Sequence, residues 1–158
     1  NLFECYLKTI EKKWSRPYLN LDFFKGLITT QTKNKIILVS AFQDKQLLGC
    51  SIHFLGNETL YGRYWGCLRE VPYLHFELCY YQAIEYAIKK RIKRIEAGAQ
   101  GEHKISRGYL PTLTYSNHWI KDSVMSVAIE NFLKKESKII EKNIDYLLKS
   151  ITFRLIEK

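Results

Sequence analysis

The sequence predicts a mixed α/β fold, in which an antiparallel meander of three strands is followed by a parallel strand–helix–strand crossover. Three observations predict it. Three β-rich runs follow one another with very short turns between them, and short turns join antiparallel strands. A stripe of apolar residues at helical spacing comes next. A further apolar run follows that helix directly, so the strands on either side of the helix can lie parallel.

Each element has its own signal. Apolar residues at helical spacing predict a first helix over residues 2–13, and Pro17 ends it. Asp22 is the expected N-cap of a second, short helix. The meander is expected to have strands at residues 36–42, 48–54 and 60–66. The crossover helix is then expected at residues 74–91, and the strand after it at residues 92–97.

The rest of the chain is expected to contain a loop, a short helix, a strand and a long helix. The loop covers residues 98–101 and the short helix residues 102–107. Residues 112–119 are expected to form a strand. Asp122 is the expected cap of the last helix, whose apolar stripe is interrupted at residues 136 and 137. A kink or a change of packing partner is expected there.

Composition supports one globular domain and excludes several other classes. The chain has 158 residues, and its 3 Trp, 11 Tyr and 8 Phe need a core to bury them. With 8 Gly and 3 Pro it is neither collagen-like nor of low complexity. The longest uncharged apolar stretch, near residues 36–42, is far shorter than the roughly 20 residues of a membrane-spanning helix. We expect no membrane span, no signal peptide and a cytoplasmic location.

The four cysteines and the positive charge are less informative. No C-x-x-C pair occurs and the four histidines are scattered, so no metal site is predicted. The cysteines are expected to be buried free thiols, with Cys67 the alternative choice for a catalytic thiol. The formal charge is +9, and its densest run is residues 89–94. This run suits either an anionic polymer such as RNA or the solvated end of a helix.

The residues best suited to chemistry follow the strand expected after the crossover helix. Ligands of open α/β sheets bind beyond the carboxyl ends of strands. Glu102 and His103 can transfer protons near neutral pH, and Lys104 and Arg107 can bind an anion. The glycine-bearing start of the loop allows close approach of a ligand to the backbone. The alternative is a polar loop whose charged groups are merely solvated.

Two further clusters are candidates. Tyr61, Arg63 and Trp65 are expected on one strand face, where the arginine can stack between the aromatic rings and hold a carboxylate or phosphate. The alternative is an aromatic sheet face packed on a helix. On the strand expected over residues 112–119, Tyr115 and His118 point to opposite faces. His118 is as readily explained by a structural role, and so are His53 and His75.

Five segments of the chain resemble the C-terminal half of the FemAB-like family of peptidoglycan biosynthesis/recognition proteins. These bacterial proteins belong to the GNAT (acyl-CoA N-acyltransferase) superfamily. The segments are LYGRYWGC at 60–67, HFELCYYQ at 75–82, EAGAQGEHK at 96–104, RGYLP at 107–111 and YSNHW at 115–119. The resemblance runs from about residue 23 to about residue 132. It implies a GNAT-like fold and a larger protein with two tandem domains. Residues 1–158 are then expected to be one domain, its C-terminal half.

The resemblance implies acyl or aminoacyl transfer to an amine of a cell-wall precursor or another small substrate. The donor is then acyl-CoA or aminoacyl-tRNA, and neither is established. The catalytic candidates are Glu102 or His103, to accept the proton of the amine, and Tyr109 or Tyr115, to protonate the leaving group. The backbone amides near residues 98–101 are the candidates to stabilise the oxyanion. The candidates for binding substrate are Arg63, Trp65, Gln100, Gly101, Lys104, Arg107, Tyr115 and His118.

One departure from ordinary acetyltransferases leaves a second function open. Those enzymes carry a glycine-rich loop before the crossover helix, and its amides grip the pyrophosphate of CoA. The matching residues 67–74 contain no glycine, and Pro72 removes an amide donor. The alternative function is therefore a catalytically silent module that recognises a wall precursor, a peptide or a nucleic acid in the same cleft.

Overall fold

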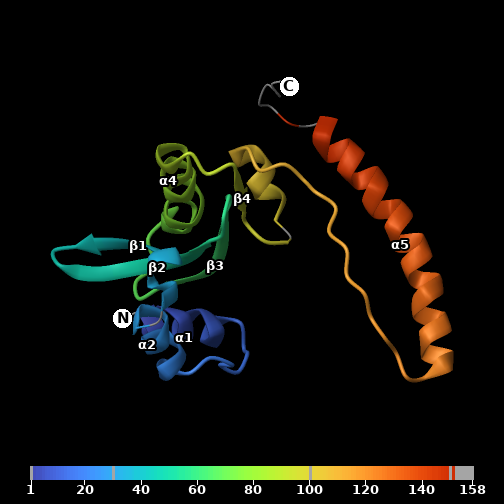
Figure 1. Ribbon diagram of the computed structural model, residues 1–158, viewed down its shortest axis with the longest axis horizontal. Coiled ribbons are helices and arrows are strands. Elements are labelled where there is room, and N and C mark those ends of the chain that lie inside the picture. Colours follow the sequence, from blue (N-terminus) through green and yellow to red (C-terminus); the bar gives the residue numbers. More distant parts are fainter. Residues whose placement is uncertain (1, 30, 100, 150, 152–158) are drawn as a thin grey trace. The chain divides into compact units, whose positions relative to one another are not determined.

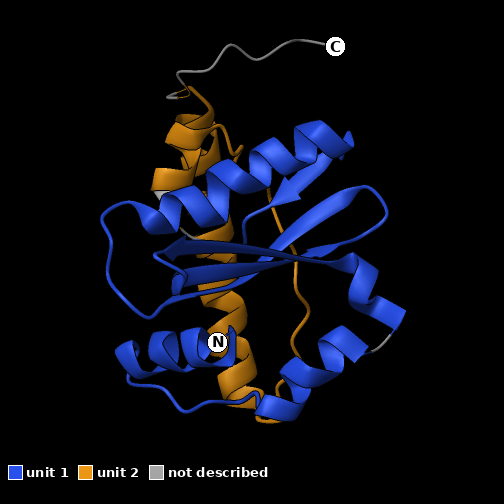
Figure 2. Cartoon of the chain, turned by 90° about the vertical axis from the view of Figure 1, so that its left-hand side faces the viewer, with its two compact units in different colours: residues 1–99 blue, residues 100–158 orange. Residues whose placement is uncertain are grey.

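The computed structural model describes residues 2–29, 31–99, 101–149 and 151, without the side chain of Glu102. The chain forms two compact units, Asn1–Ala99 and Gln100–Lys158, and each is described here by itself (Figure 2).

The first unit is built on one four-stranded sheet. Its strands are β1 (Ile36–Gln43), β2 (Gln46–Leu55), β3 (Thr59–Cys67) and β4 (Arg94–Glu96), and they lie side by side in that order (Figure 1). The first three strands are antiparallel, and β4 is parallel to β3. The predicted fold class, a meander followed by a parallel crossover, is therefore confirmed and is compatible with a GNAT-like fold.

Two helices at the N-terminus cover one face of this sheet. They are α1 (Leu2–Lys12) and α2 (Leu21–Thr29), and the short 3₁₀ helix η1 (Gln31–Lys35) leads into β1. The expected cap of α2 at Asp22 is wrong. Asn20 caps the helix instead, because its side-chain oxygen accepts the N–H of Phe23 at 3.0 Å. Asp22 lies inside the first turn and pairs with Lys25.

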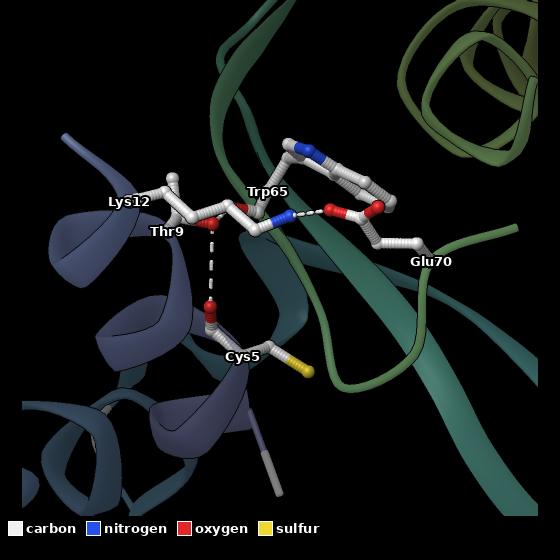
Figure 3. A network of polar contacts seen from close by, with 5 residues as sticks. All are labelled: Cys5, Thr9, Lys12, Trp65 and Glu70. Atoms are coloured by element: carbon white, nitrogen blue, oxygen red, sulfur yellow. Dashed lines mark hydrogen bonds and ion pairs between the residues drawn. The ribbon is translucent and has the colours of Figure 1, made fainter.

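Helix α1 packs unusually close to β3, at a glycine. A Cβ atom added to Gly66 would lie 1.9 Å from the carbonyl oxygen of Cys5, so only a glycine lets the helix approach this far. The contact is completed by Thr9, whose hydroxyl donates to the carbonyl oxygen of Trp65 at 2.7 Å (Figure 3). At the exposed end of the helix, Lys12 pairs with Glu70 (Figure 3).

The core between α1 and the sheet contains aromatic rings and two thiols. Tyr6 is 3 % exposed, packs against Phe24 and Tyr64, and accepts two backbone N–H groups through its hydroxyl oxygen. The thiols of Cys5 and Cys50 are buried and hydrogen-bonded to each other, and this bond and burial raise the pKa of Cys50. The predicted burial of free thiols is thus confirmed for these two cysteines.

The crossover helix covers the opposite face, and it is not regular. It consists of α3 (Leu74–Phe76), the π-helical turn η2 (Glu77–Tyr81) and α4 (Gln82–Lys90). The π-turn inserts one residue into the helical spacing. As a result the backbone N–H of Gln82 donates to the carbonyl of Glu77, five residues earlier. The side chains of the same two residues are also bonded, because the Gln82 amide donates to the Glu77 carboxylate at 2.8 Å. Four core residues of this helix are buried against the sheet: Leu78, Tyr80, Ala83 and Ala87.

The second unit contains the 3₁₀ helix η3 (Glu102–Arg107) and the long helix α5 (Ser123–Lys149). Asp122 caps α5 as predicted, because its carboxylate accepts the N–H of Met125 at 2.7 Å. The helix continues through residues 136 and 137, and the hydroxyl of Ser137 donates to the carbonyl of Leu133 at 2.8 Å. The strand expected over residues 112–119 is wrong. No other described strand pairs with this segment, which has no regular secondary structure. Among the described residues, no helix has the length and apolar character needed to cross a membrane.

Candidate functional site

Arg63 and Trp65 lie on β3, but the predicted stacking of Arg63 between Tyr61 and Trp65 does not occur. In the pairing of β2 with β3, Ile52 faces Tyr64 and His53 faces Gly62, so Arg63 is an extra residue without a partner. Such a bulge reverses the alternation of side chains. Tyr61 therefore lies on the sheet face that packs on α1, and Trp65 on the face that packs on the crossover helix.

The two side chains then have different surroundings. The guanidinium of Arg63 is exposed and lies 4.7 Å from the ring centroid of Tyr64, its neighbour in the chain. Trp65 is half-buried, and its ring lies 5.3 Å from that of His75. Arg63 thus keeps its charge at the surface, while Trp65 forms part of the packing against α3.

The bulge lies where β3 and β4 separate. The two parallel strands pair only over three positions, from Thr59 with Arg94 to Tyr61 with Glu96. Beyond that point β3 continues to Cys67 without a strand partner on this side among the described residues. We call this point, where the two strands diverge, the opening, and ligands of open α/β sheets commonly bind beyond the carboxyl ends of such strands.

A buried polar pair lies on the sheet face beside this opening. The Ser51 hydroxyl donates to the carbonyl of Leu78 at 2.7 Å and lies 2.9 Å from Nε2 of His53. Because the single hydroxyl hydrogen is used on Leu78, Nε2 of His53 carries the hydrogen of their contact. The Nδ1 atom then has a lone pair, and this buried atom has no hydrogen-bond donor among the described residues. Burial lowers the pKa of His53.

From the sequence alone, His53 is explained by a structural role. Ser51 and His53 alternate with apolar residues along β2, which predicts that they share a face. The contact with Leu78, which lies in the π-turn, joins segments far apart in the chain and could not be predicted in this way. Close to Nδ1 lies Gly62. A Cβ added there would meet the carbonyl oxygen of Glu96 at 3.5 Å and Nδ1 of His53 at 3.6 Å. The His53 ring is therefore adjacent to the end of β4.

The predicted polar segment lies in the second unit, on and around η3. Gln100 lies outside the described residues, as does the side chain of Glu102. Gly101 and Gly108 flank the helix with φ angles of 95° and 88°, a backbone that favours glycine. A Cβ added to Gly101 would lie 2.7 Å from Cε1 of His103, so the imidazole of His103 lies directly over this glycine.

The two cationic residues of this segment, Lys104 and Arg107, have different surroundings. Arg107 donates to the carbonyl oxygen of His103 at 2.6 Å, so part of its guanidinium holds the turn together. Lys104 is half-buried, and this burial lowers its pKa. Tyr109 is half-buried and follows the helix, with its N–H bonded to the carbonyl of Lys104.

Tyr115 and His118 lie in the irregular segment after η3. Tyr115 is 89 % exposed. The Nε2 atom of His118 lies 2.9 Å from the hydroxyl of Ser116, two residues earlier, so these two side chains lie together although the segment is not a strand. Arg63 and Trp65 belong to the first unit and the other predicted site residues to the second. The assembly of all of them into one site remains a prediction.

The amides before the crossover helix are largely engaged. The N–H of Leu74 donates to Val71, and the N–H groups of Phe76 and Glu77 both donate to the carbonyl of Tyr73. Tyr73 itself has a φ of 63°. Bonded amides are not free to bind a pyrophosphate, which agrees with the absence of glycine from this segment.

The chain matches the model of a known protein family over most of its length. The family model named FemAB-like, described as peptidoglycan biosynthesis/recognition, matches residues 1–155. The match covers nearly the whole chain and is longer than the resemblance seen in the sequence motifs. A search of curated proteins finds no match.

Proposed function

The chain belongs to the FemAB-like family, and we propose that it transfers an acyl or aminoacyl group to an amine of a peptidoglycan precursor in the cytoplasm. The observation that supports this most is the separation of β3 from β4 immediately before the bulge at Arg63. Beyond this point β3 has no described strand partner on this side, and the buried His53 lies next to it. A donor that lies along this side of β3 can form hydrogen bonds with its backbone.

The proposed chemistry is direct transfer. The amine attacks the acyl carbonyl, a C–N bond forms, and the C–S bond of a thioester or the C–O bond of an aminoacyl ester breaks. Glu102 or His103 accepts the proton of the amine, and Tyr109 or Tyr115 protonates the leaving thiolate or alkoxide. In this proposal Lys104 and Arg107 bind the anionic part of the donor or of the precursor, and Gln100, Gly101 and His118 are further candidates for binding substrate.

The test uses a defined acceptor and two donors. The protein is incubated with an amine-bearing muropeptide precursor and either acetyl-CoA or alanyl-tRNA, and the product is detected by mass spectrometry. His103→Ala and Glu102→Gln are expected to reduce transfer about 100-fold or more. Glu141→Gln removes an exposed carboxylate of α5 and serves as the matched control. If both site variants transfer at the rate of the unmodified protein, the proposed proton acceptors are wrong.

A second function is favoured by the engaged amides before α3. We propose it as the alternative: a module that binds the wall precursor, a peptide or a nucleic acid without catalysis. Thermal shift separates the two. Stabilisation by acetyl-CoA or another acyl-CoA contradicts the module, because only the enzyme needs a donor. Stabilisation by muropeptide or tRNA alone contradicts an enzyme that uses acyl-CoA.

A further inference from the structure

A cavity of about 420 Å³ lies in the first unit at the other end of the β3–β4 pair, where both strands begin. Its size is within the range of small-molecule sites. Half-buried Leu55, Ile92 and Tyr86 supply its apolar lining. Its polar lining consists of Asn57, Glu58, Lys90, Arg91 and Lys93.

The charge of this cavity is strongly positive. Lys93, one of its three cationic side chains, is paired with Glu58 at 2.5 Å. Lys90 and Arg91 are exposed and form no ion pair with any described residue. Two positive charges are therefore left over on one side of a cavity with an apolar lining.

The end of α4 does not account for these charges. A helix C-terminus carries about half a negative charge, and residues 89–94 include five cationic side chains. The carbonyls at this end are already bonded, because the N–H groups of Arg91 and Ile92 donate to Ile88 and Ala87. About half a negative charge does not account for two unpaired cations, so the helix end does not explain both Lys90 and Arg91.

We propose that this cavity binds a small organic phosphate, with the dianionic phosphate between Lys90 and Arg91 and the organic part against Leu55 and Ile92. The ligand carries two charges because two cations are unpaired, and guanidinium and ammonium groups are the usual partners of phosphate. The apolar lining selects an ester over inorganic phosphate. The proposal does not rest on acyl transfer, because the cavity lies at the opposite end of the strands from the opening.

A small ligand fits better than a nucleic acid. The two unpaired cations border one cavity, which has room for one phosphate group and a small organic part. Binding of a polynucleotide needs cations spaced along a track, and stacking of its bases needs exposed rings. Tyr86, the aromatic residue of the cavity, is half-buried.

The test measures the affinity of the protein for phenyl phosphate, inorganic phosphate and a short oligouridylate by calorimetry at one ionic strength. Phenyl phosphate is expected to bind several-fold more tightly than inorganic phosphate. The variant K90Q/R91Q is expected to bind phenyl phosphate at least about tenfold more weakly, because it lacks both charge-assisted contacts. Glu58→Gln is expected to bind it more tightly, since it frees Lys93 and removes a negative charge.

The matched control is K33Q/K35Q, which removes two exposed cations of η1 outside the cavity and is expected to retain the affinity. Circular dichroism confirms that each variant is folded. Equal losses in both double variants would show that only net charge matters and overturn the proposal. So would equal affinity for the two phosphates. Binding of the oligouridylate that is lost in K90Q/R91Q, without binding of phenyl phosphate, would assign the cavity to nucleic acid instead.

Discussion

The close approach of α1 to β3 gives the sharpest test of the packing in the first unit. Gly66→Ala adds one methyl group, which would lie 1.9 Å from the carbonyl oxygen of Cys5. Ordinary contact requires about 3.4 Å, so α1 has to retreat by about 1.5 Å. The obstacle is backbone, which cannot rotate away as a side chain does.

The cost of Gly66→Ala follows from two terms. Overpacking of a well-packed core costs about 1–3 kcal/mol. A retreat of this size also takes the hydroxyl of Thr9 out of reach of the carbonyl of Trp65, which costs about 1 kcal/mol. We therefore expect the free energy of unfolding to fall by about 2–4 kcal/mol.

The assay is urea denaturation followed by far-UV circular dichroism, with Gly26→Ala as the matched control. Gly26 lies in α2, and a Cβ added there meets nothing within 4 Å. Alanine is the better helix former, so this control is expected to stabilise the protein by up to about 1 kcal/mol. The same substitution thus has opposite effects at the two positions. If Gly66→Ala leaves the stability within about 0.5 kcal/mol of the unmodified protein, the packing of α1 is not as described.

Three further predictions concern hydrogen bonds and titration. Tyr6→Phe leaves two backbone N–H groups without their acceptor, and it is expected to lower the free energy of unfolding by about 1–3 kcal/mol in urea denaturation. The control Tyr146→Phe, at an exposed position of α5, is expected to cause no measurable change. Asp122→Ala removes the cap at Met125 and is expected to weaken the start of α5 by about 1 kcal/mol, seen as faster hydrogen exchange of its first-turn amides; unchanged exchange would contradict the cap. Because burial lowers the pKa of His53, the unfolded state binds its proton first, and stability is expected to fall as the pH drops below about 6.5, by at most about 1.4 kcal/mol per pH unit. His53→Gln is expected to flatten this pH dependence, and an equal slope in both proteins would show that other groups cause it.

The regular parts of the fold could be predicted because they obey local rules. Alternating residues predict β2, and the very short connection before it predicts a tight turn from β1, where Asp44 and Lys45 both adopt positive φ angles. The cap of α5 followed from a single aspartate before an apolar stripe. The cap of α2 did not, because Asn20 and Asp22 are both good caps and only the packing of the helix decides where it starts.

The errors came from contacts between distant segments. A period of two placed Tyr61 and Trp65 on one face, and a single bulged residue on β3 reversed this. The segment 112–119 has the composition of a strand but no described partner, and pairing is what stabilises a strand. The need for glycine at position 66 could not be read from the chain either, because it depends on a helix some sixty residues earlier.

The candidate site shows the same division. Residues that are close in sequence, such as Gly101 and His103, are also close in space, and this could be predicted. The buried pair of Ser51 and His53 could not, because a histidine in an apolar strand is usually explained by the core. The role of this pair depends on the two elements that it contacts, the crossover helix and β3, and both are irregular at the contact.

The two irregularities, the π-turn and the bulge, both lie next to Ser51 and His53. Ser51 donates to the carbonyl of Leu78, which lies in the π-turn, and His53 pairs with Gly62, the residue before the bulge. π-turns and bulges cost regular hydrogen bonds and are found most often beside functional sites. Here the π-turn of the crossover helix and the bulge of β3 lie against the same two side chains, next to the point where β3 and β4 separate. A packing role alone would need neither irregularity, since an apolar residue on a regular strand would fill the space. We therefore expect His53 to hold the bulge of β3 and the π-turn of the crossover helix in their places beside the opening between β3 and β4.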